Sequence, residues 1–215
     1  MERIDLEKGA KALFKTGCVQ FGDYTLKDGT FSSVYIDLRR LRSFPEEKSE
    51  IVGIYQKFIL DKQLKFDLMA DIPTATTPLV SSLSDRINVP QITPRLDFKG
   101  YGNNAKIDGV FEKGQVVLPI DDVLSSGKTK LQAIDIFRSN QLLVNDLVVL
   151  IDREQGGEAE LEKIGVKTHF VYGLQGLLLD GKNLGFLSDG QYLAASVGLW
   201  NSSTSFNMSK VGCFG

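Results

Sequence analysis

Apolar runs rich in β-branched residues, separated by helix-like segments, constrain the fold of this 215-residue chain more than any other feature. The apolar runs lie at residues 66–73, 87–96, 115–122, 146–153 and 166–174, and the helix-like segments at 79–86, 128–139 and 158–164. Near-continuous apolar strands that alternate with helices are typical of a parallel sheet covered on both faces. The pattern therefore predicts an α/β fold with a central, mostly parallel β-sheet flanked by helices.

The N-terminal part of the chain follows a different pattern. Residues 6–14 have one apolar helical face, and residues 24–40 are predicted to form two strands around a glycine-containing turn. Pro45, followed by two glutamates, is a favourable helix start, and this helix is expected to run to about Lys62. Residues 96–109 are polar and have no periodicity, and a loop of that length is typically functional.

Charge and composition argue against several classes of function. The formal net charge of −2 leaves no basic surface for nucleic acid as a main partner. No apolar run reaches the length of a membrane span, and the charged N-terminus does not resemble a secretory signal. Cys18 and Cys213 are too few and too far apart for a metal site, so free thiols in a reducing cytoplasm are expected. We therefore expect a cytoplasmic protein that acts on small molecules.

The most informative stretch is "VVLPIDDVLSSGKTK", residues 116–130. Its Gly-Lys-Thr ending is similar to a nucleotide-binding phosphate loop, but Asp122 stands where that loop requires its first glycine. An aspartate there opposes a triphosphate and prevents a close approach of the backbone. The pattern therefore argues against an NTPase.

A second interpretation uses every residue of this stretch. A strand that ends at Ile120 places Asp121 and Asp122 at the sheet edge where ligands bind in open α/β folds, and their carboxylates suit a sugar diol. The turn into the next helix offers backbone N–H groups and the helix dipole to a phosphate. This phosphate turn consists of Ser125, Ser126, Gly127, Lys128 and Thr129. Together they describe a ribose 5-phosphate site; the simpler alternative is a strand-turn-helix with two solvated aspartates.

This stretch resembles the phosphoribosyl-pyrophosphate (PRPP) motif of type I phosphoribosyltransferases, in which an apolar run leads into an acidic pair and a small hydroxyl-rich loop. Three further stretches resemble orotate phosphoribosyltransferase, including the corresponding half of the bifunctional UMP synthase. They are residues 12–40, "PRLDFKGYGNNAKIDG" at 94–109 and "VLIDREQGG" at 149–157. The resemblance implies the type I phosphoribosyltransferase fold in a single domain. Its expected parts are an N-terminal helix and hood region at 1–62, an α/β core at 63–180 and a C-terminal segment at 181–215.

The resemblance also implies a reaction: Mg²⁺-dependent transfer of phosphoribosyl from PRPP to orotate, giving orotidine 5′-monophosphate and pyrophosphate in pyrimidine biosynthesis. It places Lys99 on the family's catalytic lysine, in a loop that closes over the site.

Lys27 and Arg153 would orient orotate, since arginine engages a carboxylate bidentately. Further substrate-binding residues implied are Tyr35, Arg95 and Tyr101. Mg²⁺ is expected on PRPP and water near Asp121, without direct protein ligands, and a homodimer with shared active sites is implied.

Three positions depart from the family pattern, although at one of them, Tyr101, tyrosine also occurs in the family. Leu96 replaces a lysine expected to touch phosphate, and one lost charge-assisted contact costs about 1.5–3 kcal/mol. Lys128, in the phosphate turn, is expected to replace part of this lost contact with phosphate. Asp71 stands where the family has glycine, and its carboxylate is expected either to hold Mg²⁺ through water or to repel pyrophosphate. His169, on a predicted strand, is expected to be structural.

Two other functions remain open at this point. A protein that binds PRPP but has weak or lost catalysis would account for Leu96 and Asp71. A type I enzyme that acts on another base is the second alternative, and the Arg153 segment argues against it.

Overall fold

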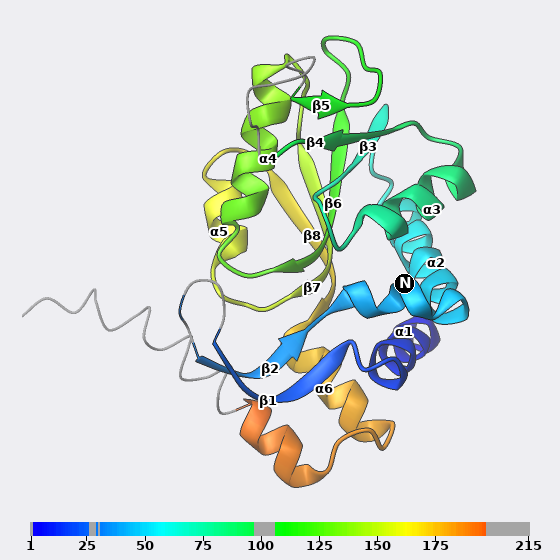
Figure 1. Cartoon of the computed structure of the whole chain (residues 1–215), viewed down its shortest axis with the longest axis vertical. Helices are drawn as coiled ribbons and strands as arrows, with labels where there is room; N and C mark the ends of the chain where they lie inside the picture. Colours follow the sequence, from blue (N-terminus) through cyan, green and yellow to red (C-terminus); the bar gives the residue numbers. More distant parts are fainter. Residues whose placement is uncertain (1, 26–28, 30, 97–105, 197–215) are drawn as a thin grey trace, which may run out of the picture.

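The computed structural model describes residues 2–25, 29, 31–96 and 106–196. Six strands of this part form a central sheet in the order β5-β4-β3-β6-β7-β8 (Figure 1). The strands are β3 Leu68–Asp71, β4 Gln91–Pro94, β5 Ile107–Asp108, β6 Val117–Leu124, β7 Asp146–Asp152 and β8 Lys167–Gly173. Neighbouring strands pair in parallel except β5, which is antiparallel to β4. The predicted mostly parallel sheet is therefore confirmed.

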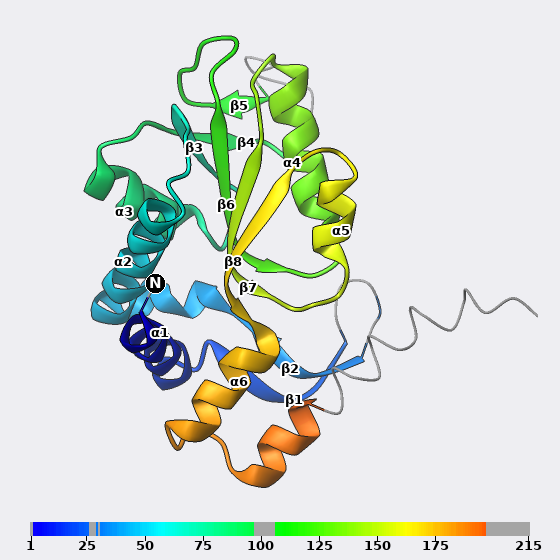
Figure 2. The ribbon, with the colours of Figure 1, turned by 180° about the vertical axis from the view of Figure 1, so that it is seen from behind.

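Two helical layers cover the sheet (Figures 1 and 2). The helices are α1 Arg3–Lys15, α2 Pro45–Asp61, α3 Thr77–Ile87, α4 Lys128–Ser139, α5 Gly157–Glu162 and α6 Leu174–Asn183. Ile120 and Val148 pack in one core with α1, α2, α3 and α6, whereas Val117 and Val149 pack in a second core with α4 and α5. None of the helices in the described ranges is long and apolar enough to cross a membrane.

Local sequence explains where α2 begins and where α3 ends. α2 starts with Pro45 in its first turn, followed by Glu46 and Glu47, which complement the positive end of the helix dipole. α3 ends at a left-handed residue, Asn88, whose short polar side chain tolerates that conformation. The predicted helices at 45–62, 79–86 and 128–139 are confirmed to within a few residues at their ends.

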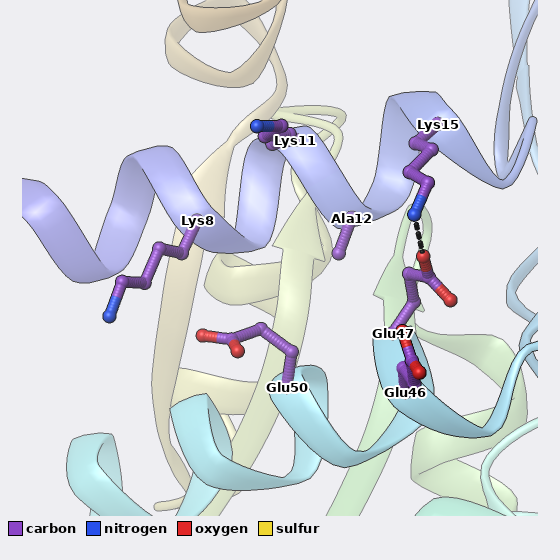
Figure 3. A pocket seen from close by; sticks show the side chains of 7 residues that line it. All are labelled: Lys8, Lys11, Ala12, Lys15, Glu46, Glu47 and Glu50. Carbon is purple, nitrogen blue, oxygen red and sulfur yellow. Dashed lines mark hydrogen bonds and ion pairs between the residues drawn. The ribbon is translucent and has the colours of Figure 1, made fainter.

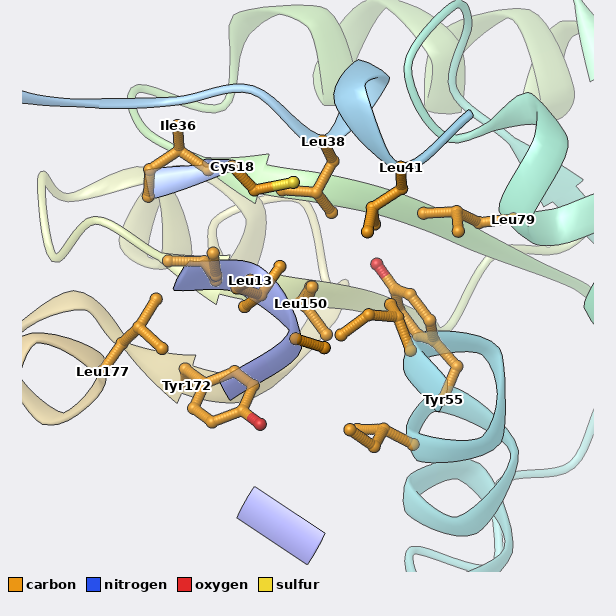
Figure 4. Close-up of a cluster of buried hydrophobic side chains, with 14 of the residues drawn as sticks. Leu13, Cys18, Ile36, Leu38, Leu41, Tyr55, Leu79, Leu150, Tyr172 and Leu177 are labelled. Atoms are coloured by element: carbon orange, nitrogen blue, oxygen red, sulfur yellow. The ribbon is translucent and has the colours of Figure 1, made fainter. Parts of the chain in front are cut away.

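The N-terminal hairpin forms a small hood beside the sheet. It consists of β1 Val19–Thr25 and β2 Phe31–Ile36, which pair antiparallel and are followed by the 3₁₀ helix η1 Leu38–Ser43. β1 begins before the predicted start at Tyr24. Figure 4 shows Cys18, Ile36 and Leu38 of this region in one cluster with Leu13 of α1 and Tyr55 of α2. This shared core fixes the hood next to the carboxyl ends of β6 and β7.

The structure differs from the sequence expectation in three further places. β6 runs to Leu124, so the prediction that this strand ends at Ile120 is wrong; the ladder continues because β7 pairs with Val123 and Leu124. The polar stretch predicted as a loop ends in the short strand β5. α6 and η1 have no counterpart in the sequence prediction.

Candidate active site

The acidic pair lies in the last half of β6, and its two carboxylates have different surroundings. Asp121 is only 4% exposed. Its Oδ1 accepts hydrogen bonds from the Thr76 hydroxyl (2.7 Å) and from the backbone N–H of Asp122 (2.9 Å). Its Oδ2 lies 2.6 Å from Nζ of Lys130. Asp122 is partly exposed, and its Oδ1 accepts a bond from its neighbour's backbone N–H at Val123. Protein donors therefore contact both carboxylate oxygens of Asp121, whereas Asp122 is partly exposed as a residue.

The electrostatics of the pair follow from this arrangement. Burial, and then the charge of Asp121, raise the pKa of Asp122 to about 7, while Lys130 acts in the opposite direction. Tyr55 lies beneath the pair and donates its hydroxyl to the backbone oxygen of Asp121 at 2.8 Å. Burial raises the pKa of Tyr55, so it stays a neutral donor. Near neutral pH, Asp122 can thus accept a hydrogen bond or, when protonated, donate one to a sugar hydroxyl.

The phosphate turn joins β6 to α4 as predicted. Gly127 has φ of +79°, a left-handed conformation that suits glycine, and it caps α4. The first-turn N–H groups of α4 have no acceptor within the helix and point out of its N-terminus. Gly157 packs against this turn, because a Cβ there would lie 2.3 Å from the backbone oxygen of Ser125. Lys128 and Thr129 are exposed, so their side chains are accessible to an anion.

Arg153 links the carboxyl end of β7 to the hood. It is 5% exposed, and its Nη2 donates to the Ser32 hydroxyl at 2.8 Å. Its Nη1 donates to the backbone oxygen of Val34 and its Nε to the Gln155 side chain, each at 3.3 Å. The predicted orotate arginine therefore lies between sheet and hood.

Tyr35 lies on the other face of β2. Burial alternates along this strand, with Ser32 and Val34 buried and Tyr35 partly exposed. The Tyr35 ring stacks on Tyr24 with centroids 5.1 Å apart, and its hydroxyl accepts a bond from Nη2 of Arg39 at 3.1 Å. The structure therefore does not bring the Tyr35 side chain to the face where Arg153 meets Ser32.

Asp71 ends β3, directly beside β6, and neutral donors enclose its carboxylate. It is fully buried. Its Oδ2 accepts a bond from the Thr77 hydroxyl, and its Oδ1 from the Thr93 hydroxyl and from Nε2 of Gln91 (2.9 Å). Neither expected role, an Mg²⁺ contact through water or repulsion of pyrophosphate, matches a carboxylate that faces three protein donors.

The segment after β4 contributes one predicted residue to the described structure. Arg95 pairs with Asp108 of β5, with its Nε 2.9 and 3.1 Å from the two carboxylate oxygens, and this pairing lowers the pKa of Asp108. The Arg95 side chain is 40% exposed, so it is accessible from solvent. The backbone oxygen of Leu96 accepts a bond from Gln132 of α4 at 3.3 Å. Three other predicted residues, Lys27, Lys99 and Tyr101, lie outside the described residues.

Sequence reasoning missed Lys130, Thr76 and Tyr55, which surround the acidic pair. A signal for Lys130 is present: it shares a helical stripe with Ala133, Ile134 and Phe137, all buried, so a lysine stands on the core face of α4. No comparable signal marks the other two. His169, as expected, has a structural partner, with its Nε2 2.7 Å from Oδ1 of Asp146.

Two cavities lie away from the acidic pair. One open cavity of about 290 Å³ lies between α1 and α2 (Figure 3), and another of about 380 Å³ lies beside α5 and the start of β8. Lysines and glutamates line the first, including the pair Lys15 and Glu47. Neither cavity is lined by a predicted site residue. Within the described ranges, no group of three or more His, Cys, Asp and Glu is placed to hold a metal ion.

The sheet order, the hood and the acidic strand-turn-helix define a type I phosphoribosyltransferase fold. No family model matches the chain. UMP synthase from Leishmania donovani has a similar structure, with a TM-score of 0.83 and 38% identity, covering 91% of this chain and 42% of that chain. Orotate phosphoribosyltransferase from Methanocella arvoryzae is 36% identical over 155 residues, 72% of this chain and 87% of the relative. The chain therefore belongs to the orotate phosphoribosyltransferase family.

Several similar proteins are longer than this chain. The bifunctional enzyme PyrF/PyrE from a Nostoc species is 35% identical over 182 residues, which make up 85% of this chain and 38% of the relative. The chain thus spans less than half the length of this relative and of the Leishmania protein.

Proposed function

We propose that this chain transfers the phosphoribosyl group of PRPP to orotate, giving orotidine 5′-monophosphate and pyrophosphate. Family membership supports the reaction. The observation that carries it is the position of Asp122: a partly exposed residue beside the phosphate turn, near the carboxyl end of the central strand β6. A sugar diol and a monophosphate at adjacent subsites match the phosphoribosyl part of PRPP.

The sugar and its phosphate have distinct partners in this proposal. Asp122 accepts a hydrogen bond from a ribose hydroxyl, and Asp121 holds it in place through the shared backbone contact. The phosphate turn, residues 125–129, receives the 5-phosphate with its backbone N–H groups and the exposed side chains of Lys128 and Thr129.

The base and the leaving group have other partners. Arg153, at the hood, orients orotate together with Lys27. Tyr35 lies on the opposite face of β2, and its place near orotate stays a prediction from the sequence resemblance. Lys99 and Arg95 stabilise the negative charge that develops on the departing pyrophosphate, and Tyr101 belongs to the same segment. For Lys27, Lys99 and Tyr101 this rests on the sequence resemblance.

Mg²⁺ is proposed to arrive on the oxygens of PRPP, where it would neutralise charge on the leaving group. This fits the described part of the chain, in which protein donors engage the carboxylates of Asp71 and Asp121. A homodimer with shared sites is also proposed. Mixing Lys99→Ala with Arg153→Ala subunits is expected to restore part of the activity, and no restoration would argue against shared sites. The cytoplasmic location stays a prediction.

The test of the proposed function is the loss of orotate absorbance with PRPP and Mg²⁺, followed by identification of orotidine 5′-monophosphate. We expect product with orotate and none with adenine or hypoxanthine in its place. Product with a purine base, and none with orotate, would overturn the substrate assignment.

A PRPP-binding protein without efficient turnover is the second candidate, and Leu96 favours it, because an apolar side chain stands where a phosphate contact is expected. Such a protein would show a PRPP-dependent rise in melting temperature without product. The two measurements on one sample separate the candidates.

A further inference from the structure

Lys130 is a buried cation in the first turn of α4, in contact with Asp121 of the acidic pair. Its side chain is 10% exposed, and that of Asp121 is 6% exposed. Nζ lies 2.6 Å from Oδ2 of Asp121 and donates to the backbone oxygen of Val123, also at 2.6 Å. One ammonium group thus holds a carboxylate and the end of β6.

The cost of burying these charges explains why the contact is specific. An isolated ammonium in a protein interior is strongly unfavourable, so a buried lysine requires a close partner. Two adjacent carboxylates in the same place are also unfavourable when both are ionised. Lys130 pairs with Asp121, and the other oxygen of Asp121 is bonded to Thr76 and to the N–H of Asp122.

We propose that Lys130 is a positioning residue that divides the acidic pair: it holds the Asp121 carboxylate inside the protein and leaves Asp122 to meet the sugar. The assignment of a sugar rests on the proposed function; the division of the pair rests on the contacts of Lys130 alone. Among the described residues, Nζ of Lys130 contacts the Asp121 carboxylate and the backbone oxygen of Val123, so it acts on Asp122 through Asp121 and through its charge.

The division has a consequence for proton binding. The titratable groups that act on Asp122 are Asp121 on its own strand, Lys130 on α4 and Tyr55 on α2. Asp121 favours the protonated form of Asp122, and Lys130 favours the ionised form. Without the lysine charge, Asp122 would keep its proton to higher pH and would be a poorer acceptor for a sugar hydroxyl near neutral pH.

The direct test is a ¹³C NMR titration of aspartate carboxyl carbons between pH 4 and 9, with the Asp122 signal assigned by Asp122→Asn. Lys130→Met, which keeps side-chain length and removes the charge, is expected to raise the Asp122 midpoint by about 1 pH unit or more. Lys130→Arg is expected to restore a midpoint close to that of the natural protein. Lys113→Met, at an exposed lysine outside the site, is the matched control and should leave the midpoint unchanged.

Lys130→Gln covers the case in which the methionine variant does not fold, because glutamine keeps a donor for Asp121 and Val123 but carries no charge. An Asp122 midpoint that stays in place in the uncharged variants would overturn the proposal. So would an equal shift in Lys130→Arg, because that variant retains the positive charge.

A second measurement separates this inference from the proposed reaction. The pH dependence of kcat/KM for PRPP is expected to move upward in Lys130→Gln by the same amount as the NMR midpoint. If the natural protein makes no orotidine 5′-monophosphate but the NMR midpoint shifts, the reaction is wrong and the division of the pair stands. If product forms but the midpoint does not shift, the reaction stands and the role of Lys130 is wrong.

Discussion

Two neighbouring parallel strands, β3 and β6, each carry a buried aspartate near the carboxyl end, and the protein neutralises them in different ways. Asp71 on β3 faces three neutral donors. Asp121 on β6 faces an ammonium group and a hydroxyl, and it has a second acid beside it. At Asp71, both carboxylate oxygens already accept hydrogen bonds from neutral protein donors. The second site keeps one carboxyl, Asp122, partly exposed. A buried acid near a strand end is therefore not by itself a ligand site. On β6 the group available to a ligand is the neighbouring acid, Asp122.

The largest expected difference between the Asp71 and Asp121 sites is in the free energy of unfolding. Asp121→Asn leaves Lys130 as an unpaired buried cation, so we expect a loss of about 3–5 kcal/mol in the free energy of unfolding. Asp71→Asn removes bonds from neutral donors only, and about 1–3 kcal/mol is expected. Urea unfolding monitored by circular dichroism measures both. In the double variant Asp121→Asn with Lys130→Met, part of the loss should return. Equal losses in the two single variants would contradict the distinction between an acid held by neutral donors and an acid paired with a buried lysine.

The next difference is in catalysis. Asp122→Asn removes the charged acceptor for the sugar, and kcat/KM for PRPP is expected to fall roughly ten- to a hundredfold. Asp71→Asn should change it by only a few fold, because that carboxylate is buried and bonded to three protein donors. Initial rates of orotate consumption, on variants shown to be folded, measure this. A larger loss in Asp71→Asn than in Asp122→Asn would reverse the assignment.

A substitution after β4 is expected to improve PRPP binding. Leu96 follows the strand that supplies Thr93 to Asp71, and Leu96→Lys adds a cation where the sequence resemblance predicts a lysine that contacts phosphate. We expect the KM for PRPP to fall roughly tenfold, the size of one contact to a charged group. Leu96→Met, which adds no charge, is the control. A similar gain with methionine would show that packing rather than charge is responsible.

The last difference between the two sites is in the pH dependence of stability. The folded protein holds a proton on Asp122 up to about pH 7, whereas the unfolded chain releases it near pH 4. The folded state therefore binds more protons between these values, and the contribution of Asp122 to stability falls as pH rises from 4 to 7. Asp122→Asn should remove this fall, and Asp71→Asn should retain it. Denaturant midpoints at pH 5 and pH 7.5 give the comparison.

Much of the fold follows from local patterns. The strands β3, β4, β6, β7 and β8 coincide with the apolar runs, and α2, α3 and α4 begin and end close to the predicted residues. Gly127 and the turn after the acidic pair also lie where the sequence places them. Strand and helix periodicities are properties of neighbouring residues, so they can be read without knowing the packing.

The partners of the charged residues could not be predicted in this way. Thr76 reaches Asp121 across 45 positions of sequence, and Arg153 reaches Ser32 across 121. The end of β6 was misplaced for a similar reason: two aspartates suggest the end of a strand, but pairing with β7 extends it to Leu124. The free energy of such contacts depends on burial, which only the assembled fold supplies.

The amino-acid sequence by itself determined the alternation of strands and helices, the acidic pair and the turn beside it, because these depend on side-chain period and backbone preference. Only the tertiary structure decided that Asp71 and Asp121 are enclosed and that Asp122 is accessible. A carboxylate becomes an interior group or a ligand group according to the donors that surround it, and Gln91, Thr93 and Lys130 reach these acids only when the sheet and helices pack.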